Sequence, residues 1–181
     1  MTTLSLDPRR TALVLIDLMP RIVALDTVPL KGSEVQERCV ALAKATRSVG
    51  GLVVNVRVER PGVDHQPEGS GFAVEPEPGD LEIVKHTLGA FGRSTLDADL
   101  QQRNITTLAL AGIATNFGVE STARAADDLG YETVYLTDAM TGLDHHAHDF
   151  ALTQIFPRLG TLCTGVEFVA ALHGEAAAVD R

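Results

Sequence analysis

The most informative part of the chain reads LAGIATNFGVESTAR, residues 110–124. Its apolar start ends at Gly112, and a Thr-Asn pair then begins a segment with helical spacing that reaches Gly130. The pattern predicts a strand, a tight turn and the start of a helix. Backbone N–H groups at such a turn have no acceptor within the helix, so they favour a substrate carboxylate or a developing oxyanion. The alternative is an ordinary turn that is capped by Thr115 or Asn116.

Two further strands are expected to end at a charged residue. Asp17 follows the apolar run 12–16, and Lys85 follows the short run 81–84. Because ligands bind at the carboxyl edge of an open parallel sheet, we expect Asp17 and Lys85 to face one site. Each has an ordinary alternative, since an acid at a strand end can cap a loop and a lysine there is most often solvated.

Strands alternate with helices along the whole chain. We expect strands at 11–17, 52–58, 82–86, 107–112, 132–137 and 160–164, and helices at 33–49, 95–104, 119–129, 145–156 and 166–172. This order predicts an α/β protein with a three-layer, doubly wound sheet of about six mainly parallel strands. Residues 1–181 are expected to form a single domain, and the tail 174–181 is expected to fray.

Composition and simple motifs disfavour several classes of partner and function. The chain has 15 Lys and Arg against 24 Asp and Glu, a formal net charge of −9, so we expect neither nucleic acid nor an anionic membrane as partner. No signal-peptide pattern or long apolar run is present, which favours the cytoplasm. Cys39 and Cys163 form no Cys-x-x-Cys pair and are expected to be buried. No Gly-x-Gly-x-x-Gly follows the first strand, which argues against a nucleotide-binding module.

The segment 59–80 is rich in Pro, Gly, Glu and Asp and lacks helical or strand periodicity. A loop of this length in a compact domain is usually functional or mobile, and we interpret it as a flap over the site. It contains a single histidine, His65, which disfavours a metal site in this part of the chain.

These segments together resemble the isochorismatase-like hydrolase superfamily, which includes isochorismatases, nicotinamidases and N-carbamoyl amidases. The resemblance rests on residues 12–17, on Lys85 with Gly89-Ala90-Phe91 and Thr95-Leu96, and on residues 112–124. In order and spacing it covers nearly the whole chain. It implies a Rossmann-like six-stranded fold and a hydrolase that needs no cofactor and acts on a small molecule. It also implies a homo-oligomer of two, four or more subunits.

Position 118 departs from most of that family, which carries a nucleophilic Cys where this chain has Gly118. Isochorismatases also have Gly there and cleave a vinyl ether without a covalent intermediate. The resemblance therefore implies that Asp17 supplies a proton and that Lys85 tunes it. An adjacent ammonium favours ionised Asp17, whereas an acid catalyst must be protonated, and the sequence leaves this balance open. The alternative is a cysteine-less relative of amidases that binds a ligand or serves as an oligomeric scaffold.

The turn itself supplies further candidates. Gly118 is expected to leave room for a substrate ring or to admit the attacking water. The resemblance implies a cis peptide bond between Ala114 and Thr115, and these residues with Asn116 are expected to contact the substrate.

Three substrate-binding candidates lie elsewhere in the chain. Phe91 is expected either to form an aromatic wall of the pocket or to pack in the core. Arg57, near the end of a strand, is a candidate for binding a substrate carboxylate. His148 matches a His that is often found in the fifth crossover of the family. Together with His145 and His146 it resembles a metal cluster, but without a third ligand or a nearby Cys the exposed start of a helix is the favoured interpretation.

Overall fold

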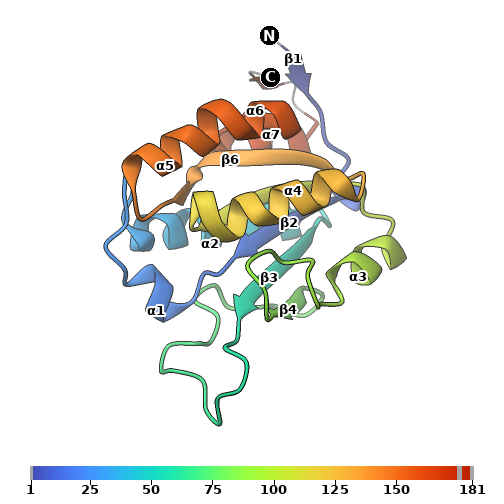
Figure 1. Ribbon diagram of the computed structural model, residues 1–181. Helices are drawn as coiled ribbons and strands as arrows, with labels where there is room; N and C mark the ends of the chain where they lie inside the picture. The colour runs from blue at the N-terminus through green and yellow to red at the C-terminus, as the bar shows by residue number, and fades with distance from the viewer. Residues whose placement is uncertain (1, 175–176, 180–181) are drawn as a thin grey trace.

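A computed structural model describes residues 2–174 and 177–179 (Figure 1). Its centre is a parallel sheet with strand order β4-β3-β2-β5-β6-β7. The strands are β2 Thr11–Ile16, β3 Leu52–Val58, β4 Leu81–Lys85, β5 Thr107–Ile113, β6 Glu132–Thr141 and β7 Thr161–Cys163. The predicted α/β fold with a doubly wound sheet is confirmed. The strand order reverses between β2 and β5, where sheets of this kind bind ligands.

Helices cover both faces of the sheet (Figure 1). One layer contains α2 Gly32–Ser48 and α7 Gly165–Leu172; the other contains α3 Leu96–Gln102, α4 Glu120–Asp128 and the successive segments α5 His145–Phe150, η3 Ala151–Ile155 and α6 Phe156–Leu159. Both helix layers pack against the buried strand β2. Leu13 belongs to the hydrophobic cluster that contains Phe168, and Val14 belongs to the cluster that contains Phe156. Such two-sided burial explains why its sequence is apolar without alternation.

Two elements run further than the sequence predicted. β6 continues past residue 137 to Thr141, and its pairing with β5 shifts register between Leu110 and Gly112. Gly112 has φ +122°, and a Cβ there would collide with the carbonyl of Ile16. The helical segment was expected to end before Pro157, but it continues through this residue. Pro157 lies in the first turn of α6, where a missing N–H removes no hydrogen bond of that helix.

Four short elements were not predicted. They are η1 Pro8–Arg10, α1 Pro20–Val23 and the antiparallel pair of β1 Thr2–Leu4 with β8 Ala177–Val179. Fraying of the tail was therefore wrong for 177–179, where strand pairing supplies the order; residues 175, 176, 180 and 181 lie outside the described part. No helix in 2–174 is both long and apolar enough to cross a membrane.

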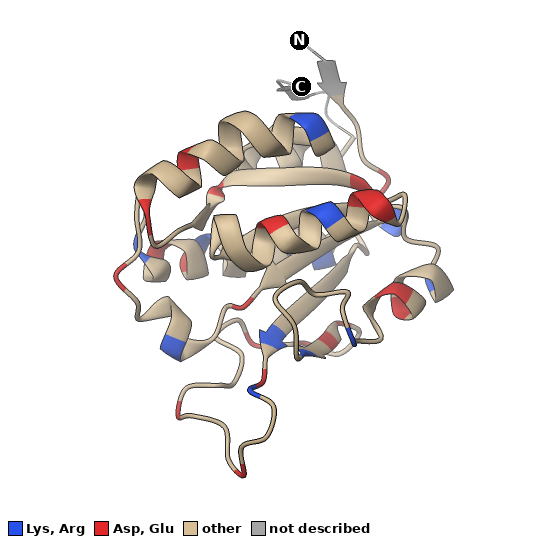
Figure 2. Ribbon diagram, viewed as in Figure 1, with Lys and Arg blue, Asp and Glu red and all other residues tan. Residues whose placement is uncertain are grey.

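Residues 59–80 form the crossover from β3 to β4 without a helix. The second half is fixed to the body: Ala73 N donates to Leu18 O at 2.7 Å, and Arg47 Nη2 lies 2.5 Å from Asp80 Oδ2. The first half projects beyond the carboxyl end of β3 (Figure 1). Figure 2 shows acidic and basic positions mixed along the elements, without a run of basic positions on any helix.

Candidate active site

A buried ion pair joins Asp17 and Lys85 at the carboxyl edge of the sheet. Asp17 follows β2 with a left-handed φ of 51°, and its N–H donates to Val56 O at 2.9 Å. Lys85 ends β4, two strands away, and its side chain reaches across the end of β3. Lys85 Nζ lies 2.7 Å from Asp17 Oδ2, and the two residues are 1% and 7% exposed. The structure thus brings together the two charged residues singled out in the sequence.

The environment of Asp17 favours the protonated carboxyl. Burial raises its pKa above the ordinary value, and this effect outweighs the opposing charges of Lys85 and Arg21. The second oxygen, Oδ1, is buried and has no hydrogen-bond partner among the described residues. Since Oδ2 already accepts a hydrogen bond from Lys85, a proton on this carboxyl belongs on Oδ1.

Gly118 borders this pair. It lies in η2 Thr115–Val119, a π-helical turn that leads from β5 into α4. A Cβ at position 118 would lie 2.9 Å from Ile16 Cγ2, 3.0 Å from Asp17 Oδ2 and 3.1 Å from Lys85 Nζ. The space next to Gly118 is therefore taken up by the ion pair and Ile16, and is not left open for a substrate ring as the sequence had suggested.

The predicted cis peptide bond is present but was placed one residue too late. It joins Ile113 to Ala114, whereas the prediction put it between Ala114 and Thr115. Ala114 has extended backbone (φ −110°, ψ 150°) and Thr115 already begins the π-helical turn. The cis bond thus lies at the end of β5, and the Thr-Asn pair follows it.

Two polar side chains of the turn have contrasting surroundings. Thr115 Oγ1 and His148 Nδ1 lie 2.8 Å apart, and both residues are buried. Burial lowers the pKa of His148, which favours the neutral ring. Asn116 Oδ1, in contrast, is buried without a hydrogen-bond partner in the described part of the chain. Among Thr115, Asn116 and His148, only Asn116 therefore has a buried side-chain atom without a hydrogen-bond partner in the described residues.

Phe91 and Arg57 both have protein partners. The Phe91 ring stacks on Tyr131, with centroids 5.7 Å apart, and packs against the core. Arg57 Nη1 lies 2.5 Å from Glu59 Oε1, and its guanidinium stands 5.6 Å above the Phe72 ring. The charge of Arg57 is thus largely satisfied within the protein.

Sequence reasoning missed three interactions around the site. Arg21, on α1, lies near enough to act on the pKa of Asp17, and its Nε donates to Ser70 Oγ at 3.0 Å. Lys85 Nζ also donates to the carbonyl of Leu88. Thr122 Oγ1 donates to Gly118 O at 2.6 Å and accepts from a backbone amide of the 86–95 loop at 3.0 Å. The position of Thr122, four residues after Gly118 on a helix, was a usable signal; Arg21 gave none, because α1 was not predicted.

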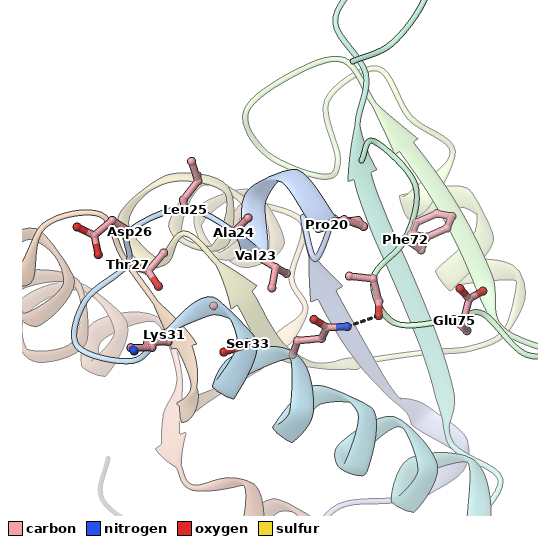
Figure 3. A pocket seen from close by; sticks show the side chains of 13 residues that line it. Pro20, Val23, Ala24, Leu25, Asp26, Thr27, Lys31, Ser33, Phe72 and Glu75 are labelled. Atoms are coloured by element: carbon pink, nitrogen blue, oxygen red, sulfur yellow. Dashed lines mark hydrogen bonds between the residues drawn. The ribbon is translucent and has the colours of Figure 1, made fainter. Parts of the chain in front are cut away.

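A cleft of about 730 Å³ lies beside α1 (Figure 3). It is bounded by α1, by the 24–27 segment, by the start of α2 and by residues 72, 73 and 75. Gln36 also lines the cleft and donates to Ala73 O at 2.7 Å. Asp17, Lys85 and Gly118 do not line it, so we locate the chemistry at the buried pair and regard this cleft as separate space next to it.

Metal ligands do not gather in the described part of the chain, where no group of three or more His, Cys, Asp or Glu could hold an ion. His145 Nδ1 lies 2.9 Å from Asp149 Oδ2, and His148 faces Thr115. These three histidine positions thus do not converge, and the absence of a metal site stays a prediction.

Comparison with known proteins gives matches along the whole chain. Residues 11–167 match the model of the isochorismatase domain. The chain is 36% identical to YwoC, an uncharacterised isochorismatase family protein of Bacillus subtilis, over 93% of this chain and 97% of YwoC. A solved structure of an isochorismatase family protein from Burkholderia thailandensis shares 38% identity and a TM-score of 0.86, covering 95% of this chain and 100% of that one. A shorter match, 47% identical over 66 residues, covers 36% of this chain and 26% of the ureidoacrylate amidohydrolase RutB of Variovorax paradoxus.

Proposed function

Since this chain belongs to the isochorismatase family of hydrolases, we propose that it hydrolyses a small vinyl ether such as isochorismate, without a covalent intermediate. One observation carries the proposal. The buried carboxyl of Asp17 is held by Lys85 through Oδ2, its pKa is raised, and Oδ1 is left without a partner. This is the arrangement of a general acid, while Gly118 offers no nucleophile.

The reaction follows from that geometry. Protonated Asp17 gives its proton from Oδ1 to the terminal carbon of the vinyl ether, and the π electrons of the double bond form the new C–H bond. Water adds to the resulting oxocarbenium ion, and its released proton returns to Asp17. The hemiketal then collapses to an alcohol and a ketone, which for isochorismate is pyruvate. Because Oδ1 is buried in this structure, the substrate must displace the side chains that cover it.

Two side chains are proposed to orient the substrate. Arg21 replaces Arg57 as the cation for a substrate carboxylate, because Arg57 is paired with Glu59, while no ion pair of Arg21 is found in the described residues. Asn116, whose buried Oδ1 lacks a partner, is proposed to bind a substrate hydroxyl. An isolated buried acceptor of this kind is stabilised when a ligand supplies the missing donor.

A second function has a specific observation in its favour. RutB, which the chain matches over a limited region, is a ureidoacrylate amidohydrolase. A relative of amidases without the cysteine would bind such a ligand, or serve as a scaffold, without cleaving it. The retained Asp17–Lys85 pair favours the first function, because burying such a pair is costly and a protein that only binds a ligand has no need of a proton donor.

We also propose that the protein is cytoplasmic and forms a homo-oligomer. Three large apolar side chains near the site are exposed: Phe117 at 46%, Leu143 at 48% and Phe150 at 58%. They lie on η2, on the turn after β6 and on α5. Large apolar side chains that are exposed in the monomer favour a surface that a partner covers. Sedimentation equilibrium of the wild type and of Phe150→Ser tests the assembly, which should weaken in the variant.

The test of the proposed reaction is pyruvate release from isochorismate, coupled to lactate dehydrogenase. Wild type should release pyruvate, and Asp17→Asn, which keeps the shape of the side chain, should lose about 10²- to 10⁴-fold in rate, the usual contribution of a general acid. Asp64→Asn, in the projecting half of the 59–80 loop, is the matched control and should keep full activity. If wild type releases no pyruvate but binds ureidoacrylate without cleaving it, the second function is supported and the first is abandoned.

A further inference from the structure

A second cavity lies at the amino-terminal edge of the sheet. It has a volume of about 360 Å³, and its walls come from residues that precede or begin four neighbouring strands. These residues are Arg9 before β2, Gly51 and Leu52 at the start of β3, Asp80 before β4 and Ile105 before β5, together with Arg47, Gly50, Pro78, Gly79 and Arg103. Asp17 and Lys85 lie at the opposite end of the strands, the carboxyl end. β3 is seven residues long, so about 20 Å separates the two edges.

The residues that line this cavity carry more positive than negative charge, whereas the whole chain is negatively charged. Three of its residues are arginines and one is acidic, a balance of +2 in a chain whose net charge is −9. Arg47 is not free to bind a ligand, because its guanidinium is paired with Asp80 at 2.5 Å and with Glu77, which does not line the cavity, at 2.7 Å. Arg9 forms no ion pair with any described residue. Arg103 is paired only with Asp99, at 3.8 Å, and its side chain is 41% exposed.

The rim of the cavity is open at its glycines. Gly50 and Gly79 both have positive φ, and a Cβ at either would have no neighbour within 4 Å. A ligand can therefore approach the backbone closely at either glycine. Both positions also resist replacement by other residues, because L side chains rarely adopt these conformations.

From this arrangement we propose that the cavity binds a small oxyanion with two or more negative charges, such as a phosphate ester or a dicarboxylate. A guanidinium presents a planar fork of N–H donors that matches carboxylate and phosphate oxygens. Arg9 and Arg103 supply two such forks from segments that are distant in sequence. The volume suits a small metabolite. The site lies at the opposite edge of the sheet from the ion pair, and it does not depend on the reaction proposed there.

The test is calorimetric titration of the full chain with inorganic phosphate and, separately, with succinate, at constant ionic strength set with sodium chloride. We expect saturable binding of at least one probe to wild type, and binding at least about tenfold weaker to Arg9→Gln and to Arg103→Gln. Arg60→Gln, which removes the same charge from the projecting half of the 59–80 loop, should bind like wild type. The probe that saturates distinguishes the phosphate source from the dicarboxylate source.

Two results would overturn the site. One is the absence of saturable binding of both probes to wild type. The other is an equal loss in all three arginine variants, which would mean that only the net charge matters. Circular dichroism of each variant shows whether the fold is retained. Because two independent substitutions are used, misfolding of one leaves the other to decide.

Discussion

Replacing Gly118 by alanine tests whether the ion pair fills the space beside the turn. The added Cβ would lie 2.9 to 3.1 Å from Ile16 Cγ2, Asp17 Oδ2 and Lys85 Nζ, about 0.3–0.5 Å short of the 3.4 Å of ordinary contact. All three neighbours are buried, so they cannot move aside into solvent. Overpacking of this kind costs about 1–3 kcal/mol.

Part of that cost is offset, because a Gly→Ala change reduces the conformational entropy of the unfolded chain. This effect stabilises the folded state by about 0.4–1 kcal/mol. We therefore expect Gly118→Ala to lower the free energy of unfolding by about 1–2 kcal/mol. For a domain of this size the melting temperature should fall by roughly 2–8 °C.

Gly71→Ala is the matched control, because a Cβ there has no neighbour within 4 Å and the backbone is not left-handed. Its stability should equal or slightly exceed that of wild type. Urea unfolding followed by far-ultraviolet circular dichroism suits a chain without tryptophan. If both alanine variants unfold at the same urea concentration, the space beside Gly118 is not filled, and the derivation from the Cβ contacts is wrong.

The other predictions concern the site and its supports. Arg21→Gln should raise KM for a carboxylated substrate about tenfold or more, whereas Arg57→Gln should change KM little, as steady-state kinetics will show; equal effects would remove the preference for Arg21. Thr122→Val leaves a buried amide of the 86–95 loop without its acceptor and should lower the free energy of unfolding, measured with urea, by about 1–3 kcal/mol. Thr122→Ser keeps the hydroxyl and should lose much less stability. Because the pKa of Asp17 is raised and the proton donor must be protonated, kcat/KM should fall as pH rises through that pKa. Asp17 also makes the stability of the fold depend on pH. Its contribution to the free energy of unfolding is complete below the pKa that Asp17 has in the unfolded chain, and it is lost as pH rises through the higher pKa of the folded protein. A rate that instead rises with pH over that range would mean that ionised Asp17 is the active form.

Much of the fold could be predicted because its determinants are local. The continuous apolar run of β2 reflects burial on both faces, and the charged residues at the ends of β2 and β4 are placed on one edge by parallel topology alone. Alternation of strands and helices was then sufficient to predict a doubly wound sheet. The tail strand β8 was missed because its pairing with β1 joins the two ends of the chain.

The details of the site depend on tertiary contacts that no local pattern carries. The position of Arg21 near Asp17 depends on α1 and on the contact of Arg21 with Ser70 in the 59–80 loop. The space beside Gly118 depends on side chains from β2 and β4. Burial raises the pKa of Asp17 against the opposing effect of the Lys85 ammonium, and this balance depends on tertiary packing that the sequence does not show.

The direct test of the central claim is the reaction of wild-type protein with isochorismate in D₂O, with the released pyruvate analysed at once by mass spectrometry and proton NMR. Proton transfer from Asp17 to carbon predicts pyruvate with one deuterium in its methyl group, and Asp17→Asn should release almost none. Pyruvate without deuterium on carbon, or undiminished release by Asp17→Asn, would contradict the assignment of Asp17 as the acid.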